Sequence, residues 1–251
     1  MQEFVPAELF GEDYLHFYES ILTAERSDAE TELIIRLGEL EPGMEILDAP
    51  CGHGRLTNRL AAKGFRVTGI DASPLFLERA RADAAEDGVT VDYRHGDLRS
   101  LTFGPQFDAL VNWFTSFGYF DDETNRETLA GFHGVLKPGG RLVMEHMNRD
   151  RVVRFLGNLQ APRAVGLLTE QGDDVEIDVN RFDPLSGRIA SDRTIFRDGR
   201  RRTHRFEVRV FTFTELRDWL LAAGFTDVQG YGEDGEALTL DSGRMVVVAS
   251  A

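Results

Sequence analysis

The chain has a single cysteine, Cys51, among its 251 residues. A disulfide framework and a cysteine metal cluster each need several cysteines, so both are excluded, and no other cluster of ligand residues requires a metal. We expect Cys51 to be a small packing residue. No apolar run approaches the length of a membrane span, and the N-terminus lacks the basic-then-apolar pattern of a signal peptide. We therefore expect a soluble cytoplasmic protein without a membrane partner.

The chain is also short of positive charge. It has 28 lysines and arginines against 43 aspartates and glutamates, which gives a net charge of -15 and a pI near 4.8. Nucleic-acid surfaces need a basic patch, so a nucleic-acid partner is disfavoured. The segment 197–205 is locally basic, with five arginines around Asp198-Gly199. We interpret it as a solvated hairpin.

The most informative stretch is Glu45 to Gly54, a short apolar strand that ends at Asp48 and leads into a glycine-bearing turn. A helix pattern follows over 55–63, and a second apolar run over 65–70 ends at Asp71. This strand, turn, helix, strand and acid unit binds adenosine-containing ligands in many α/β proteins.

The glycine turn narrows the choice of ligand. Gly52 and Gly54 allow close approach of the backbone to a ligand, and the following helix N-terminus favours a carboxylate or phosphate. Asp71 can accept hydrogen bonds from ribose hydroxyls. A dinucleotide site normally needs a third glycine, but Thr57 stands at that position. The P-loop pattern fails too, because no Gly-Lys-Ser/Thr follows.

Four ordered motifs carry a family resemblance: 48–54, Asp71, Gly96-Asp97-Leu98 and the segment 136–140, Leu-Lys-Pro-Gly-Gly. Together they resemble the class I S-adenosylmethionine (SAM)-dependent methyltransferases, strongly over residues 40 to 150 and more loosely beyond. One position departs from the family pattern, because Pro50 stands where a glycine is usual and supplies no backbone N–H donor.

The pattern of elements is typical of an α/β fold. Apolar positions at helical spacing over 8–38 predict two helices that break near Ser27-Asp28. Alternating strands and helices then imply a parallel sheet that is covered on both faces. Ser73 should cap the second helix of this series, with Pro74 in its first turn. The predicted strands are 45–49, 65–70, 89–95, 107–113 and 141–147, and the predicted helices are 55–63, 74–86 and 122–136.

The pattern changes after Arg149. Alternating β-formers over 173–183, 188–197 and 201–212 predict an inserted antiparallel sheet of three strands. Thr214 should cap a helix to Ala223, and strands 225–230 and 245–250 form an antiparallel hairpin in the resembled fold. We expect a Rossmann-like, seven-stranded, mostly parallel sheet with helices on both faces. The predicted units are a helical cap (1–40), a SAM-binding methyltransferase domain (41–150 and 213–251) and an inserted β lid (151–212).

In such a sheet the ligand lies beyond the carboxyl ends of the strands. The resemblance implies that Asp71 takes the ribose hydroxyls, that Asp97 and Leu98 hold the adenine, and that Asn112 lies beside the reactive methyl. Tyr14 and Tyr18 share one helix face and either close over the methionine end or belong to the core, and Asn112 could equally be a buried structural amide. The cofactor candidates are Tyr14, Tyr18, Ala49, Pro50, Gly52, Gly54, Asp71, Ala72, Gly96, Asp97, Leu98, Asn112 and Trp113, with Arg26 as a further candidate for a carboxylate.

The segment 113–120 is unusually aromatic for a loop after a strand. Aromatic faces stabilise cations such as the sulfonium of SAM, and they also shape apolar acceptor pockets; alternatively these rings pack under the inserted sheet. The two prolines typical of base methyltransferases after the Asn112 position are absent, which disfavours methylation of nucleic-acid bases. The acceptor-binding candidates are Phe114, Phe117, Tyr119, His146 and Arg149.

Methyl transfer from a sulfonium is a direct displacement, so alignment of acceptor, methyl and sulfur supplies most of the acceleration. A base is needed only for the acceptor's proton, and His146 is the first candidate because its ordinary pKa lies near neutrality. Tyr119 and Glu145 are the alternatives, and His146 could instead be a structural histidine at a strand end. Arg149 could bind an acidic acceptor or pair with Asp150.

These observations predict a SAM-dependent methyltransferase that acts on an oxygen or nitrogen of a small molecule, with a homodimer as the candidate assembly. Two other functions stay open at this point. A nicotinamide-dependent oxidoreductase has similar architecture, although Thr57 argues against it. A SAM-binding module without transfer activity is the second alternative, kept open by Pro50 and the lack of a clear base.

Overall fold

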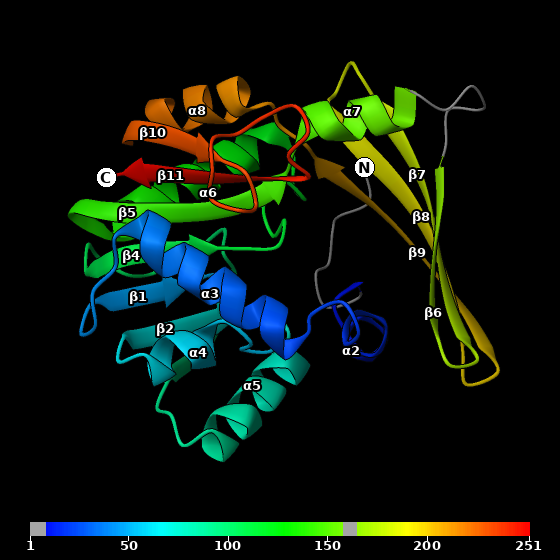
Figure 1. Ribbon diagram of the computed structural model, residues 1–251, viewed down its shortest axis with the longest axis horizontal. Helices are drawn as coiled ribbons and strands as arrows, with labels where there is room; N and C mark the ends of the chain where they lie inside the picture. Colours follow the sequence, from blue (N-terminus) through cyan, green and yellow to red (C-terminus); the bar gives the residue numbers. More distant parts are fainter. Residues whose placement is uncertain (1–8, 158–164) are drawn as a thin grey trace.

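The computed structural model describes residues 9–157 and 165–251. A seven-stranded sheet with helices on both faces makes up the larger part, and a separate four-stranded sheet stands across the carboxyl ends of its parallel strands (Figure 1). Among the described residues, no helix combines the length and apolar character that a membrane crossing requires.

The large sheet has the strand order β10-β11-β5-β4-β1-β2-β3. Strands β1 to β5 run parallel to one another, while β11 is antiparallel to β5 and β10 is antiparallel to β11. The chain reverses direction of winding between β1 and β4, which is where open α/β sheets bind ligands. The Rossmann-like prediction is therefore confirmed. The strands are β1 (Glu45–Asp48), β2 (Arg66–Asp71), β3 (Asp92–His95), β4 (Phe107–Asn112), β5 (Leu136–Met147), β10 (Thr226–Tyr231) and β11 (Arg244–Ser250).

Alternation along the buried strands supplies two cores. Ile46 faces a cluster with Leu33 and Leu60, whereas Leu47 faces one with Phe132 and Leu220 on the other side of the sheet. Helices α3 and α4 therefore cover one face, and α6 and α8 cover the other. The helices are α2 (Glu12–Tyr18), α3 (Ala24–Gly38), α4 (Thr57–Ala62), α5 (Pro74–Glu86), α6 (Asp122–Val135), α7 (Arg149–Gly157) and α8 (Phe213–Ala222).

Two predicted helix starts are wrong, and capping chemistry explains both. Helix α3 runs through Ser27 because Thr23, four residues earlier, accepts a hydrogen bond from the backbone N–H of Arg26 at 3.3 Å. Helix α8 is capped by Thr212 and not by Thr214, since Glu215 completes a capping box with Thr212. Ser73 caps α5 as predicted, by accepting from Phe76 N.

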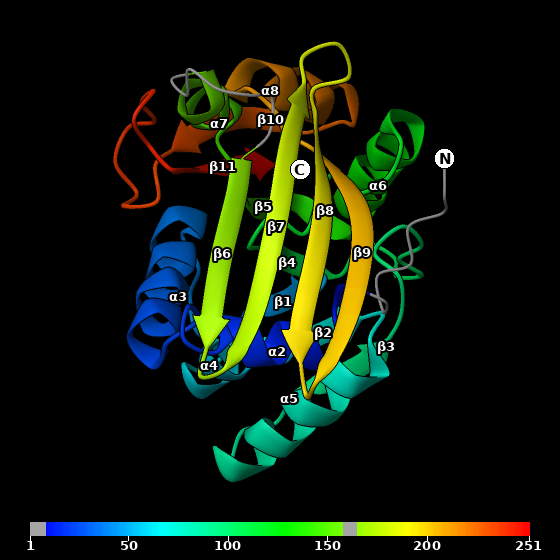
Figure 2. The same ribbon diagram turned by 90° about the vertical axis from the view of Figure 1, so that its right-hand side faces the viewer.

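The inserted sheet has four strands and not the three that were predicted. Its order is β6-β7-β8-β9, antiparallel throughout (Figure 2), and we call these four strands the lid. The missed strand is β6, whose sequence Val-Gly-Leu-Leu-Thr-Glu-Gln lacks polar–apolar alternation and gains its order by pairing with β7. The strands are β6 (Val165–Gln171), β7 (Asp174–Asp183), β8 (Arg188–Arg197) and β9 (Arg200–Arg209).

Candidate active site

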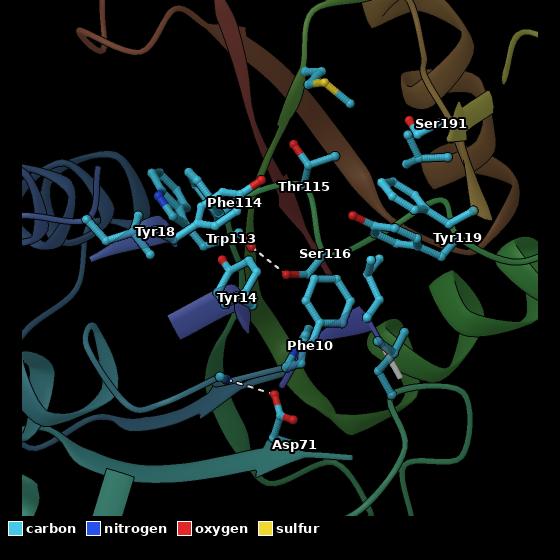
Figure 3. Close-up of a pocket in the computed structure, with 18 of the residues that line it drawn as sticks. Phe10, Tyr14, Tyr18, Asp71, Trp113, Phe114, Thr115, Ser116, Tyr119 and Ser191 are labelled. Carbon is cyan, nitrogen blue, oxygen red and sulfur yellow. Dashed lines mark hydrogen bonds between the residues drawn. The ribbon is translucent and has the colours of Figure 1, made fainter. Parts of the chain in front are cut away.

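A cavity of about 510 Å³ lies between the carboxyl ends of β1, β2 and β4, helix α2 and the inner face of the lid. Figure 3 shows Asp71 at one side of this cavity and Thr115, Tyr119 and Ser191 at the other. The volume falls within the range of small-molecule and cofactor sites. We call the part around the glycine turn and Asp71 the cofactor half, and the part against the lid the acceptor half.

The cavity brings together most of the side chains that the sequence singled out. The sequence-predicted residues that line it are Tyr14, Tyr18, Pro50, Gly52, Asp71, Ala72, Gly96, Asp97, Leu98, Trp113, Phe114 and Tyr119. The predicted residues outside the lining are Ala49, Gly54, Asn112, Phe117, His146 and Arg149.

Asp71 organises the cofactor half. Its two carboxylate oxygens accept hydrogen bonds from the backbone N–H groups of Gly52 and Ser73, each at 2.8 Å. Burial raises the pKa of Asp71, although these backbone hydrogen bonds oppose the shift. The acid at the end of β2 therefore fixes the glycine turn at the end of β1 and still presents lone pairs to the cavity.

The two glycines of the turn have different surroundings. A Cβ on Gly52 would meet no atom within 4 Å, so this residue leaves open space where the turn faces the cavity. Gly54 has a φ of +83°, and a Cβ there would lie 2.5 Å from the hydroxyl of Tyr93. Gly54 is thus required by packing against Tyr93 and Ala80 and not by the cavity itself.

Asp97 lines the cavity but already has a partner. Arg99 donates to both of its oxygens, through Nε at 3.0 Å and Nη2 at 2.6 Å. Burial acts to raise the pKa of Asp97, but the hydrogen bonds from Arg99 outweigh it and leave the pKa below its ordinary value. The carboxylate is therefore held charged and oriented, with lone pairs left for another donor.

Asn112 has the surroundings of a buried structural amide, which was the second interpretation of this residue from the sequence. It is buried, and its Nδ2 donates to the backbone carbonyl of Ala49 at 2.7 Å. This bond joins the carboxyl ends of β4 and β1 directly beneath the glycine turn. The side chain therefore supports the floor of the site and does not line it.

His146 also lies away from the cavity. Its Nδ1 is 3.1 Å from the carbonyl of Met147, and its Nε2 is 3.1 Å from the carbonyl of Phe117. Burial lowers its pKa to about 4, against those two carbonyls, which favour the protonated ring. The geometry matches the structural alternative, because both nitrogens face backbone oxygens and neither faces the cavity.

The other acceptor candidates outside the lining have partners of their own. Arg149 pairs with Glu215 at 2.6 Å, and not with Asp150. Phe117 is buried and stacks on Phe211 with ring centroids 5.7 Å apart. Arg149 therefore joins α7 to α8, and Phe117 packs against the segment between β9 and α8.

The lid contributes polar side chains that sequence reasoning missed. Arg193 binds Asp178 through two hydrogen bonds, 2.8 and 2.7 Å long, and lies 3.2 Å from a carboxylate oxygen of Glu176. Beside this pair, Ser191 donates to the side-chain oxygen of Asn180 at 2.6 Å. The signal was present in the sequence, because polar residues at alternate positions of β7 and β8 place a polar strip on one face.

The loop after β4 separates the two halves with a strained backbone. Phe114 and Thr115 have φ values of 60° and 55°, which are unusual for a bulky and a β-branched residue. Arg244 holds this loop, since its Nη2 donates to the Thr115 hydroxyl at 2.5 Å and to Glu145 at 2.6 Å. Glu145, a predicted alternative base, is buried in that ion pair and does not line the cavity.

Three guanidinium groups surround the Phe114 ring. Those of Arg26, Arg244 and Arg55 lie 5.0, 5.5 and 5.6 Å from its centroid. Glu30 bridges two of them, at 2.8 Å from Arg26 and 2.5 Å from Arg55. Arg55 and Arg244 line the cavity, whereas Arg26, the predicted carboxylate partner, stands behind them.

Aromatic side chains of and before α2 form one wall of the cavity. Tyr14 and Tyr18 stack with centroids 4.3 Å apart, and Phe10 packs edge-on against both Tyr14 and Tyr119. Burial raises the pKa of Tyr14, Tyr18 and Tyr119, so all three remain protonated phenols. Their ring faces suit a sulfonium cation in the cavity.

The cavity thus lies at the switch point of an open α/β sheet and is covered by a second, antiparallel sheet. Residues 46–140 match a family model described as a methyltransferase domain. The chain is 28% identical over 211 residues to a glycine/sarcosine N-methyltransferase from Parasynechococcus marenigrum, covering 83% of this chain and 72% of that one. It is 31% identical over 132 residues to a ubiquinone biosynthesis O-methyltransferase from Rickettsia felis, covering 52% of each.

Solved structures show the same architecture along nearly the whole chain. A SAM-dependent methyltransferase from Clostridium acetobutylicum superposes with a TM-score of 0.77 at 17% identity, over 97% of this chain and 98% of that one. The SAM-bound amino pentose methyltransferase CalS10 from Micromonospora echinaspora gives a TM-score of 0.64 at 21% identity, over 100% and 99%.

The comparisons support a class I SAM-dependent methyltransferase, the family that the four motifs resemble. Its relatives support methyl transfer from SAM to an oxygen or nitrogen of a small molecule.

Proposed function

We propose that this protein methylates an amine nitrogen of a small molecule. The observation that carries this proposal is the chemistry of the acceptor half. Among the described residues that line it, no histidine or unpaired carboxylate is present: Asp178 is committed to Arg193, and Tyr119 has a raised pKa. An alcohol needs a base to become a nucleophile, whereas an amine attacks through its own lone pair once it is neutral.

The described residues fit SAM in the cofactor half. Asp71 would accept hydrogen bonds from the ribose hydroxyls, and Asp97 with Leu98 would hold the adenine. The open space at Gly52 would admit the amino-acid part. Arg55, which lines the cavity, is the better candidate than Arg26 for the carboxylate. SAM supplies a methyl group already activated by its sulfonium, so the chain needs mainly to orient the acceptor and exclude water.

The charges of the acceptor half favour a neutral amine because they are largely paired. Arg193 is held by Asp178 and Glu176, and Arg244 is held by Glu145. Among the described residues that line this part, no carboxylate is therefore left to stabilise an ammonium ion, which favours the neutral amine. The names of the glycine/sarcosine and amino pentose enzymes agree with nitrogen as the acceptor atom.

Isotope transfer from SAM tests the proposal. The protein is incubated with methyl-deuterated SAM and a panel of amines, amino acids and amino sugars, alongside catechols and alcohols matched in size. We expect deuterated methyl on nitrogen, with kcat/KM rising with pH up to the pKa of each amine, because the acceptor and not an enzyme base sets the titration. Transfer only to oxygen would overturn the amine proposal while leaving the methyltransferase family intact.

Several sequence predictions remain proposals. These are the three-part domain division, action in the cytoplasm within small-molecule metabolism, assembly as a homodimer, and the lack of nucleic-acid and membrane partners. The net charge of -15 supports the expectation about nucleic acid.

A further inference from the structure

Helix α2 is held to the lid by a carboxylate between two arginines. Asp13 accepts hydrogen bonds from Arg202 at 2.6 and 2.7 Å and from Arg197 at 3.0 Å. Its side chain is 18% exposed, so these bonds are partly shielded from water. Burial acts to raise the pKa of Asp13, but the two arginines lower it below the ordinary value, which keeps the carboxylate charged.

Two further contacts join the same elements. His16 Nε2 lies 2.9 Å from a carboxylate oxygen of Asp174, and Arg193 Nη2 donates to the Tyr18 hydroxyl at 3.3 Å. All three contacts join α2 to the lid, whose β6–β7 and β8–β9 turns lie at the end toward α2, while its β7–β8 turn lies at the far end (Figure 2). Arg197 and Arg202, two of the arginines in the 197–205 segment, therefore pair with α2. The sequence had predicted that this segment is a hairpin whose charges face only solvent.

Helix α2 also lines the cavity. Tyr14 and Tyr18 are part of the lining that includes Asp71 and Gly52, and Tyr18 reaches the lid through Arg193 as well. One short helix of seven residues thus contacts both the cofactor half and the acceptor lid. A helix this short is marginal by itself, so its position must come from tertiary contacts.

We propose that Asp13 is a positioning residue whose pairing with Arg197 and Arg202 clamps α2 between the lid and the cofactor. The clamp keeps the tyrosine wall closed and slows release of the cofactor or its product. It also couples the two halves, because anything that seats the lid strengthens cofactor binding, and the reverse must hold equally. This inference rests on SAM binding in the cavity and is independent of the acceptor atom.

A matched pair of variants tests the clamp. Asp13→Asn removes the negative charge that lies between Arg197 and Arg202. Asp192→Asn is the control, because Asp192 also lies between two arginines, Arg181 and Arg205, but is half exposed and touches no α2 residue. Release of S-adenosylhomocysteine is followed by stopped-flow fluorescence, since Trp113 lines the cavity.

In 50 mM salt we expect Asp13→Asn to release S-adenosylhomocysteine about tenfold faster than the wild type, as expected for losing charge-assisted bidentate bonds. Asp192→Asn should stay within about twofold of the wild type. Raising salt to 500 mM should speed release from the wild type and hardly affect Asp13→Asn, because screening acts on the clamp. Arg202→Lys, which keeps the charge but loses the bidentate hydrogen bonds, should release S-adenosylhomocysteine at a rate between those of the wild type and Asp13→Asn.

Equal release rates for the wild type and Asp13→Asn would overturn the proposal, and so would equal losses in Asp13→Asn and Asp192→Asn. A wild type that binds S-adenosylhomocysteine but shows no salt-dependent release would also contradict it. The melting temperature of each variant separates a loosened helix from general unfolding, since clamp loss should change release far more than stability. Failure of the amine panel would leave this test untouched.

Discussion

Asp71 is the residue on which cofactor binding should depend most. It accepts two backbone hydrogen bonds at the glycine turn and faces the cavity. We predict that Asp71→Asn weakens S-adenosylhomocysteine binding about 10- to 100-fold, because a hydrogen bond to a charged acceptor contributes about 1.5–3 kcal/mol. Isothermal titration calorimetry measures the change.

Asp92→Asn is the matched control for that prediction, since Asp92 is exposed at the edge strand and pairs only with Arg94 among the described residues. It should leave the affinity unchanged. Affinity that survives in Asp71→Asn would show that the cavity holds the nucleoside in some other way.

His146 gives a prediction about pH. Its pKa in the folded protein is about 4, below the ordinary 6.5, so the unfolded chain binds a proton that the folded chain does not between these values. This histidine therefore removes stability as the pH falls from about 6.5 toward 4, by up to ~3 kcal/mol. In His146→Gln this part of the pH dependence should vanish, as measured by urea unfolding at pH 4.5, 5.5 and 7.

The same variant tests the catalytic interpretation of His146. We expect kcat at pH 8 to stay within about tenfold of the wild type, because neither ring nitrogen faces the cavity. A loss of a thousandfold in kcat with an unchanged KM would restore His146 as the base.

At the scale of elements, Gly118 joins the loop after β4 to the lid. Its carbonyl accepts from Arg209 N at 2.8 Å, its φ is +101°, and a Cβ there would lie 2.5 Å from the Arg209 carbonyl oxygen. Gly118→Ala must therefore push β9 away from the loop. We predict that KM for the best amine rises about tenfold or more, while the dissociation constant of S-adenosylhomocysteine changes less.

Gly104→Ala, in the segment before β4, is the control for Gly118→Ala, because a Cβ at Gly104 meets no atom within 4 Å. It should behave as the wild type in both measurements. If Gly118→Ala also left the amine KM unchanged, the lid would not form the acceptor half.

At the scale of the whole molecule, the cavity is enclosed by three parts of the chain, so ligand binding should stabilise the entire fold. At a concentration 100 times its dissociation constant, S-adenosylhomocysteine should add about 2.7 kcal/mol to the free energy of unfolding. For a domain of this size the melting temperature should rise by about 5–11 °C. Differential scanning fluorimetry measures the shift, and NADH at the same concentration should produce none.

The main sheet could be predicted because local signals agree with one another. Asp48 and Asp71 end apolar runs, and Ser73 caps the following helix by itself. Helix starts that depend on competition between nearby caps were less predictable, as Thr23 and Thr212 show. Strand β6 was not predictable, since its order comes from pairing with β7.

The residues of the candidate site also fall into those that the sequence could predict and those that it could not. Residues at strand ends, such as Asp71 and Asp97, line the cavity because the fold brings these ends together. His146 lies at the end of β5 and Arg149 two residues beyond it, but their side chains turn toward backbone carbonyls and Glu215 respectively. Strand position predicts that a residue is near the site, and only packing decides which way its side chain points.

The sequence alone predicted the cofactor half of this protein, because a glycine turn, two strand-end acids and their spacing are local signals that resemble those of the SAM-dependent methyltransferases. The tertiary structure decided the rest, namely a polar lid face, an arginine-held loop and the ion pairs of Asp13 with Arg197 and Arg202. Those features join residues as far as 189 positions apart, and no local pattern encodes a contact between segments that meet only after both sheets have formed.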